Sequence, residues 1–375
     1  MKPAALLSLV ILALAVPALR AAEAAPLPVA VAPGDPALRY AGRWDRGDAA
    51  GPRCAWSGSA VAVRFDGTAL NARIAQTGSN LLEVFVDGKP TATLDVRTGT
   101  REGTPGLFAV ASGLAPGEHT VELVKRTEFF LGVVQVLGFQ LPAEARLLPV
   151  PPAARRIEVI GDSISCGYGD EAASADESFT PDTENGAAAY GAVAARALGA
   201  DYVCVAWSGK KLWPDNSILD YYGRTLPPYV LAGRIPLTGL GATWDFASWR
   251  ADAVVINLGT NDYYRETPDP SGWAAAYKAL LARLRRQYPQ AAIYCATGPM
   301  LTDEPADRKP ASTLRAAVAA VVADARAAGD QQVRVLDFGT QDPANGLGAF
   351  RHPSLKTQRL MGEQLEAALR RDLGW

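Results

Sequence analysis

The spacing of apolar residues changes near residue 142 of this 375-residue chain, and the change divides it into two domains of different class. Between residues 37 and 141, apolar and polar positions alternate in short runs such as "SAVAVRFDG" and "LLEVFVDG", separated by Asp-Gly or Pro-Gly turn signals. Alternation with a period of two is typical of strands that have one buried face. Short strands at regular spacing predict an all-β sandwich of the jelly-roll type.

A proline-rich segment, residues 142–156, follows and predicts a semi-rigid linker. From residue 157 to 375, strand-like runs alternate with helical patterns such as "GWAAAYKALLARLRRQY". The strand-like runs end near Ile160, Trp207, Leu258, Thr297 and Phe338. This alternation predicts a three-layer α/β domain of flavodoxin-like type, with a parallel sheet between helices. Ligands of such domains bind beyond the carboxyl ends of the strands.

The first residues have the pattern of a secretory signal peptide. Lys2 precedes an apolar stretch from Ala4 to Leu19, and "AEA" at residues 22–24 supplies the small residues that a signal peptidase reads. The stretch is short for a membrane span, so residues 1–24 are predicted to be a cleaved signal, with an uncleaved anchor as the alternative. The mature protein is then expected to be secreted or periplasmic, without stable membrane insertion.

Charge and composition exclude several classes of function. The formal net charge is −2 and no basic block is present, so the chain has no electrostatic means of holding nucleic acid. It has only two histidines and no Cys-x-x-Cys pair, so neither a metal cluster nor another cofactor is expected. Export would permit disulfides, but Cys204 and Cys295 lie in apolar, strand-like runs and are predicted to be buried thiols, as is Cys166.

Ser163 follows the first strand of the second domain, in "IEVIGDSISCGYGD". Gly-Asp-Ser alone also fits an ordinary turn, because all three residues favour turns. A nucleophilic serine needs a base, which is usually histidine. His119 shares a strand face with apolar residues of the first domain and is predicted to be structural. His352, in "RHPSLKTQ", follows the last strand and directly precedes the last helix, so it is the predicted base.

Two further loops at strand ends offer donors for an oxyanion, which acyl transfer requires. Gly209, in "AWSGKKLW", is placed where a backbone N–H can approach a substrate closely. Asn261, in "INLGTNDYY", can donate from its side-chain amide. Each residue has a plain alternative as a turn residue. Four complementary groups at four strand ends together favour an acyl-transfer site.

These four blocks, in this order, resemble those of the SGNH (GDSL-type) hydrolases. With the β-rich first domain, "CAWSGSAVAVRFDGT" and the extended "GDSISCGYGD", the chain resembles carbohydrate esterase family 2, whose members pair a jelly-roll domain with an SGNH domain. The resemblance implies removal of acetyl groups from plant polysaccharides and sugars. It also implies that Ser163 is the nucleophile, that His352 is the base, and that Ser163 N–H, Gly209 N–H and Asn261 form the oxyanion hole.

One departure concerns the catalytic acid. SGNH enzymes commonly place an aspartate two or three residues before the histidine, where this chain has Phe350 and Ala349. Either a backbone carbonyl orients His352 in a Ser-His dyad, or another acid completes a triad; Asp337 and Asp342 are the nearest in sequence.

Residues 207–249 form a long insertion rich in aromatic side chains, which suit sugar stacking or simply pack the loop. Trp213, which closely follows the Gly209 block, is predicted to bind substrate in the pocket. The sequence therefore predicts an exported serine esterase acting on acetylated carbohydrate without a cofactor. A lipid or thioester hydrolase on the same scaffold, and a non-catalytic carbohydrate-binding protein, are the alternatives.

Overall fold

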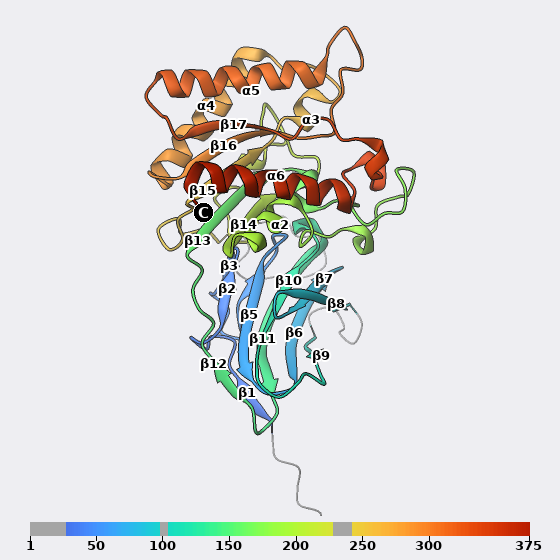
Figure 1. Cartoon of the computed structure of the whole chain (residues 1–375), viewed down its shortest axis with the longest axis vertical. Coiled ribbons are helices and arrows are strands. Elements are labelled where there is room, and N and C mark those ends of the chain that lie inside the picture. Colours follow the sequence, from blue (N-terminus) through green and yellow to red (C-terminus); the bar gives the residue numbers. More distant parts are fainter. Residues whose placement is uncertain (1–27, 98–103, 228–241) are drawn as a thin grey trace, which may run out of the picture.

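The computed structural model describes residues 28–97, 104–227 and 242–375, so the predicted signal peptide lies outside the described residues. Figure 1 shows two stacked domains, an all-β domain below and an α/β domain above it. Within the described ranges, no helix is both long and apolar enough to cross a membrane.

Two antiparallel sheets form the β-domain. The first sheet has the order β3-β4-β11-β6-β9, with β1 also paired to β11; the second has the order β12-β5-β10-β7-β8, with β2 also paired to β5. The strands of the first sheet are β1 (Val29–Val31), β3 (Trp44–Asp45), β4 (Arg53–Cys54), β6 (Leu70–Gly78), β9 (Gly106–Ala111) and β11 (Gly132–Leu141). The strands of the second are β2 (Arg39–Ala41), β5 (Ala60–Asp66), β7 (Leu81–Val86), β8 (Lys89–Asp95), β10 (Glu118–Lys125) and β12 (Arg146–Leu148).

The core between these sheets has the predicted alternation. Val61, Val63 and Phe65 of β5 are buried in it, and His119 lies at the domain's rim, hydrogen-bonded to Asp87 at 2.8 Å. On the outer face of the second sheet, Phe85 is buried in a small apolar cluster that includes Ala187 of the second domain.

The predicted linker, 142–156, is shorter than expected. Residues 146–148 form β12, an edge strand that pairs antiparallel with β5, and β13 begins at Arg155. The pairing places Leu147 against the sandwich core and satisfies backbone groups at the edge of β5. The β-domain also begins before residue 37, because β1 pairs with β11.

The α/β domain has a five-stranded parallel sheet in the order β14-β13-β15-β16-β17. Its strands are β13 (Arg155–Gly161), β14 (Ala200–Ala206), β15 (Ala253–Asn257), β16 (Ala292–Thr297) and β17 (Val333–Asp337). Its helices are α1 (Ser163–Cys166), α2 (Tyr190–Ala197), α3 (Thr260–Tyr263), α4 (Pro270–Gln287), α5 (Pro310–Ala327) and α6 (Leu355–Leu373). The strands end within one residue of the predicted positions. β14 lies on one side of β13 and β15 on the other, so the strand order reverses there, and doubly wound domains bind ligands at such a point.

Helices cover both faces of this sheet, as predicted (Figure 1). Leu284 of α4 and Val318 of α5 belong to one apolar cluster, while Tyr190 of α2 and Leu365 of α6 belong to the other. Five 3₁₀ turns connect the described elements: η1 (Phe129–Leu131), η2 (Pro181–Thr183), η3 (Ile218–Asp220), η4 (Pro343–Asn345) and η5 (Ala349–Arg351).

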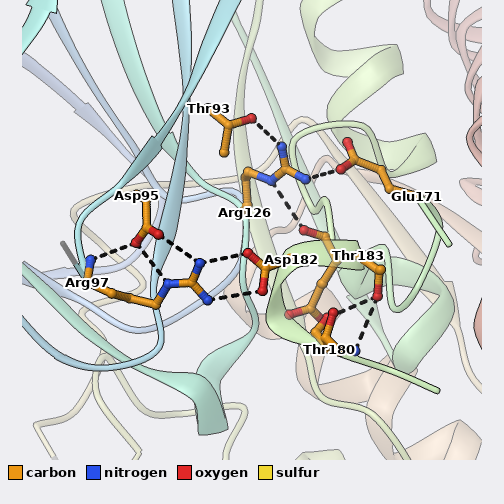
Figure 2. Close-up of polar contacts among 9 residues, drawn as sticks. Thr93, Asp95, Arg97, Arg126, Glu171, Thr180, Asp182 and Thr183 are labelled. Carbon is orange, nitrogen blue, oxygen red and sulfur yellow. Dashed lines mark hydrogen bonds and ion pairs between the residues drawn. The ribbon is translucent and has the colours of Figure 1, made fainter.

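The two domains share both apolar and polar contacts. Trp56 and Phe129 of the β-domain belong to the same buried cluster as the α4 and α5 core residues. Figure 2 shows Arg126 and Arg97 reaching from the β-domain to Glu171 and Asp182 of the α/β domain. Because the interface contains both buried apolar surface and charged pairs, the β-domain can hold parts of the α/β domain in place.

Candidate active site

Ser163 is placed by a sharp turn at the end of β13. Asp162 is the N-cap of the one-turn helix α1, and its side chain accepts a hydrogen bond from Ile164 N at 3.1 Å. Ser163 is the first residue of that turn, and Gly167, with a φ of 77°, ends it in the left-handed conformation that glycine favours. The serine hydroxyl therefore stands at the carboxyl edge of the sheet.

His352 meets Ser163 at this edge. Its Nε2 lies 2.9 Å from Ser163 Oγ, and its Nδ1 lies 2.9 Å from the carbonyl oxygen of Ala349. A carbonyl only accepts, so Nδ1 carries the proton and Nε2 is free to accept the hydroxyl hydrogen of the serine. This is the tautomer that a general base for Ser163 requires.

The carbonyl that orients the ring belongs to a constrained turn. Phe350 and Arg351 have φ values of 49° and 64°, which L-residues rarely adopt, and they bring the Ala349 carbonyl back to the His352 ring. Ala349 N donates to Gly169 O at 2.9 Å, and Gly348 N donates to His352 O at 2.8 Å. The "GYGD" segment after Ser163 thus anchors the turn that carries the base.

Neither aspartate considered from the sequence serves His352. Asp337 accepts from Thr297 Oγ1 at 2.6 Å and pairs with Arg315, while Asp342 caps η4 by accepting from Ala344 N at 2.9 Å. For both ring nitrogens of His352 the described partners are Ala349 and Ser163, so neither ring nitrogen has a carboxylate partner among the described residues.

Burial changes the titration of His352. Its ring is half-buried beneath Tyr168, whose own ring lies 4.6 Å away between centroids and stacks on Phe179. Burial lowers the pKa of His352 to about 4, and the hydrogen bond to the Ala349 carbonyl offsets only part of that effect. The imidazole is therefore neutral, and able to act as a base, at neutral pH.

Ser163 and Gly209, two of the residues that line the cleft, each carry a backbone N–H group. Gly209 lines the cleft with a φ of 78°, and among the described residues no acceptor pairs with its N–H or with that of Ser163. Both groups are thus available as hydrogen-bond donors, and their place in an oxyanion hole stays a prediction.

Asn261 lines the same cleft but is already engaged. Its Nδ2 donates to Lys210 O at 2.9 Å and to Asp162 Oδ2 at 3.3 Å. Burial raises the pKa of Asp162 to about 7, with the Asp262 and Glu128 carboxyls adding to the rise, so Asp162 is a weak acceptor near neutral pH. The Asn261 amide therefore makes one hydrogen bond of ordinary length and one longer bond within the cleft lining.

The site opens into a cleft of about 750 Å³. Polar side chains such as Thr302, Thr340 and Gln341 line part of it, while the residues Tyr264 and Phe350 are 64% and 55% exposed. Phe130 of the β-domain also lines the cleft, so both domains shape the site.

Trp213 is not in this cleft, which corrects the prediction from the sequence. Its backbone N donates to Asp262 Oδ1 at 3.0 Å, and its ring lies so close to Gly272 of α4 that a Cβ there would be 2.6 Å from it. The tryptophan therefore packs the insertion onto the helix. Tyr264 was recognisable, because it lies two residues after the "GTND" block, and Tyr168 lies within the "GDSISCGYGD" block, whereas Phe130 had no signal of its own.

All four cysteines lie in the described part of the chain, where they are buried and free of disulfides. Among the residues that the structure describes, no group of three or more His, Cys, Asp or Glu side chains could hold a metal ion.

Comparisons with known proteins match both domains of this chain. A family model described as "Carbohydrate esterase 2 N-terminal" matches residues 40–151, and one described as "GDSL-like Lipase/Acylhydrolase family" matches residues 159–361. A solved family two carbohydrate esterase from Clostridium thermocellum, in complex with cellohexaose, is 40% identical with a TM-score of 0.81, covering 90% of this chain and 99% of that one.

Two well-described relatives are similar to this chain in sequence over more than nine tenths of its length. The cellulase/esterase CelE of Acetivibrio thermocellus is 40% identical over 91% of this chain, and this chain spans 40% of that protein's length. An acetylxylan esterase / glucomannan deacetylase of Cellvibrio japonicus is 26% identical, covering 92% of this chain and 91% of that one.

Proposed function

On the premise that this chain belongs to carbohydrate esterase family 2, we propose that it removes acetyl groups from O-acetylated polysaccharides or sugars through a Ser163–His352 dyad. The observation that carries the proposal is the 2.9 Å contact between Ser163 Oγ and His352 Nε2, with Nδ1 held by a carbonyl, at the base of an open cleft.

In the proposed reaction, Ser163 Oγ attacks the acetyl carbonyl while His352 Nε2 takes the hydroxyl proton. The carbonyl oxygen becomes an oxyanion, which the N–H groups of Ser163 and Gly209 and the amide of Asn261 stabilise. The imidazolium then gives its proton to the leaving sugar oxygen. Water, deprotonated by His352, attacks the acetyl-serine, and acetate leaves as Ser163 regains its proton.

Two features of the cleft favour carbohydrate over lipid. The exposed rings of Tyr264 and Phe350 offer flat apolar faces of the kind on which sugar rings stack, and the side chains of Thr302, Thr340 and Gln341 make part of the cleft wall polar. A long acyl chain would instead need a continuous apolar groove. The intact pairing of Ser163 with His352 opposes a purely binding role.

Acetate release from acetylated xylan, acetylated glucomannan and simple acetylated sugars tests the proposal, together with p-nitrophenyl esters of increasing acyl length. We expect acetate from at least one carbohydrate, and kcat/KM that falls steeply beyond the acetyl ester. Preference for long acyl esters would favour the lipid hydrolase, and absence of turnover on every substrate would favour the binding protein.

We also propose export, because residues 1–24 have the pattern of a signal peptide. Mass spectrometry of the protein recovered from the periplasm or medium should find an N-terminus near Ala25. A chain that stays in the cytoplasm and begins at Met1 would refute export.

A further inference from the structure

The β-domain supplies a buried carboxylate to the loop that carries Gly209. Glu128, the residue before η1, has no exposed surface. Its Oε2 accepts from Ser208 N at 2.8 Å, and its Oε1 accepts from Ser208 Oγ at 2.5 Å. One carboxylate thus holds both the backbone and the side chain of the residue next to Gly209, across the domain interface.

The charge around Glu128 favours this role. Burial raises the pKa of both Glu128 and Glu184; the Glu128 carboxyl raises that of Glu184 further, whereas the hydrogen bonds from Ser208 lower that of Glu128, so Glu184 holds a proton more strongly than Glu128 does. Glu184 Oε2 accepts from Glu128 N at 2.8 Å, which fixes the backbone from which the Glu128 side chain extends. The buried Lys125 ammonium donates to Thr127 O at 2.6 Å and to Glu128 O at 3.2 Å, which places a positive charge beside the site.

The loop needs outside support at this point. Gly209 has no side chain, and even a Cβ built on it would have no neighbour within 4 Å, so its own packing does not fix its position. Its carbonyl accepts from Asn216 Nδ2 at 3.0 Å. The residues on its two sides are held as well: Ser208 by Glu128, and the carbonyl of Lys210 by Asn261 Nδ2 at 2.9 Å. Phe129 adds an edge-on contact with Trp207, with ring centroids 4.6 Å apart.

We propose that Glu128 is a positioning residue for the oxyanion hole: it holds Ser208 so that Gly209 N–H points at the oxygen of the tetrahedral intermediate. The β-domain then takes part in catalysis instead of serving only as an attached module. This inference rests on the proposed esterase function. It predicts a loss in kcat more than in KM, because the oxyanion exists only in the transition state and intermediate.

Three variants of similar volume test it on p-nitrophenyl acetate. Glu128→Met fills the space but gives Ser208 no strong acceptor, whereas Glu128→Gln can still accept from Ser208 N and donate to Ser208 Oγ. Glu158→Met is the matched control, because Glu158 is also fully buried at the interface, pairs with Arg43 at 2.7 Å, and makes no described hydrogen bond to residues 207–210.

We expect Glu128→Met to lose about 10- to 100-fold in kcat with KM changed less than about threefold, which is less than the loss of a whole oxyanion donor. Glu128→Gln should retain most of the wild-type kcat. Glu158→Met should lower the melting temperature at least as much while kcat stays within about threefold of wild type.

Wild-type kcat in folded Glu128→Met, or an equal loss in Glu158→Met, would overturn the inference. If Glu128→Met does not fold, Ser208→Ala removes the hydroxyl contact alone and should lower kcat by about 3- to 10-fold; an unchanged kcat there would overturn it equally. A wild-type protein with no esterase activity would instead refute the proposed function.

Discussion

Ser163 and His352 lie 189 positions apart in the chain, yet the sheet edge brings Oγ and Nε2 to 2.9 Å. The unusual member of this pair is its orienter, the Ala349 carbonyl. A carbonyl selects the same tautomer as a carboxylate but offers a dipole instead of a full charge to the imidazolium. The base is therefore well aligned, with weaker stabilisation of its protonated form than in a triad.

At the residue scale, removing either nearby aspartate should leave the dyad working. Asp337→Ala and Asp342→Ala should keep kcat within about threefold of wild type, because neither carboxylate contacts His352. His352→Ala should lose activity as completely as loss of the nucleophile, because the two act as a unit. A folded aspartate variant that loses about 10³-fold or more would instead show that a distant acid completes a triad.

The pH dependence of the reaction should reflect the buried base. Because the pKa of His352 falls from 6.5 to about 4, the acid limb of kcat/KM should lie well below 6.5. The same shift destabilises the fold as pH falls from 6.5 toward 4, since the unfolded chain then binds the proton more tightly. Tyr168→Ala uncovers the ring and should move the limb back toward 6.5, whereas a wild-type limb at 6.5 or above would contradict this account.

Ser163, Gly209 and Asn261 follow the ends of β13, β14 and β15 by two to four residues, and His352 lies in the segment between β17 and α6. Because the carboxyl ends of parallel strands meet at one edge of a sheet, the sequence pattern sufficed to predict that these residues line one cleft, whereas their catalytic roles stay predictions. Trp213 was wrongly predicted because its place depends on Asp262 and Gly272, a contact between distant segments that no local pattern reveals. Phe130 and Glu128 were missed for the same reason: their role depends on how the domains pack.

At the scale of elements, the turn of η5 is held against the "GYGD" segment with little space. Gly169 has a φ of 61°, and a Cβ on it would stand 2.5 Å from Ala349 Cβ. Gly169→Ala should therefore push away the turn whose carbonyl orients His352, and lower kcat by about 10-fold or more in addition to a stability loss of about 1–2 kcal/mol.

Gly199→Ala is the matched control, because Gly199 has the same φ of 61° and open space at its Cβ position. It should show a similar loss in thermal stability with unchanged kcat. Equal activities of the two folded variants would show that the turn does not control the base.

Element boundaries show where sequence patterns suffice. The buried parallel strands were predicted closely, because continuous apolar runs between turn residues mark them without reference to partners. Strand β12 was not, since three residues between prolines become a strand only by pairing with β5, about eighty positions earlier in the chain.

At the scale of the whole molecule, the two domains are joined by an interior that belongs to both. Arg43 of the β-domain and Glu158 of β13 form an ion pair in which neither side chain is exposed, and Tyr222 adds a hydrogen bond to Glu158 at 2.8 Å. We expect calorimetry to record one unfolding transition for both domains. If one domain unfolded alone, the other would keep a buried charge without its partner, which costs free energy.

Glu158→Gln should lower the temperature of that single transition, with a loss of about 3–5 kcal/mol for breaking one side of a buried pair. Arg64→Ala is the control, because its pair with Glu118 is exposed and lies within the β-domain, so its effect should stay below about 1 kcal/mol. If calorimetry records two unfolding transitions, and Glu158→Gln lowers the temperature of only one of them, the two domains do not share an interior.

The most direct test of the central claim is acetate release by folded Ser163→Ala beside the wild type, on the acetylated carbohydrate that the wild type deacetylates fastest. We expect the rate of acetate release by Ser163→Ala to be at least about 10⁴-fold lower than that of the wild type, with circular dichroism unchanged. The reason is that Ser163 alone can form the acetyl-enzyme. Acetate release by Ser163→Ala within about tenfold of the wild-type rate would contradict it, since the acetyl group would then leave by a route that does not need this serine.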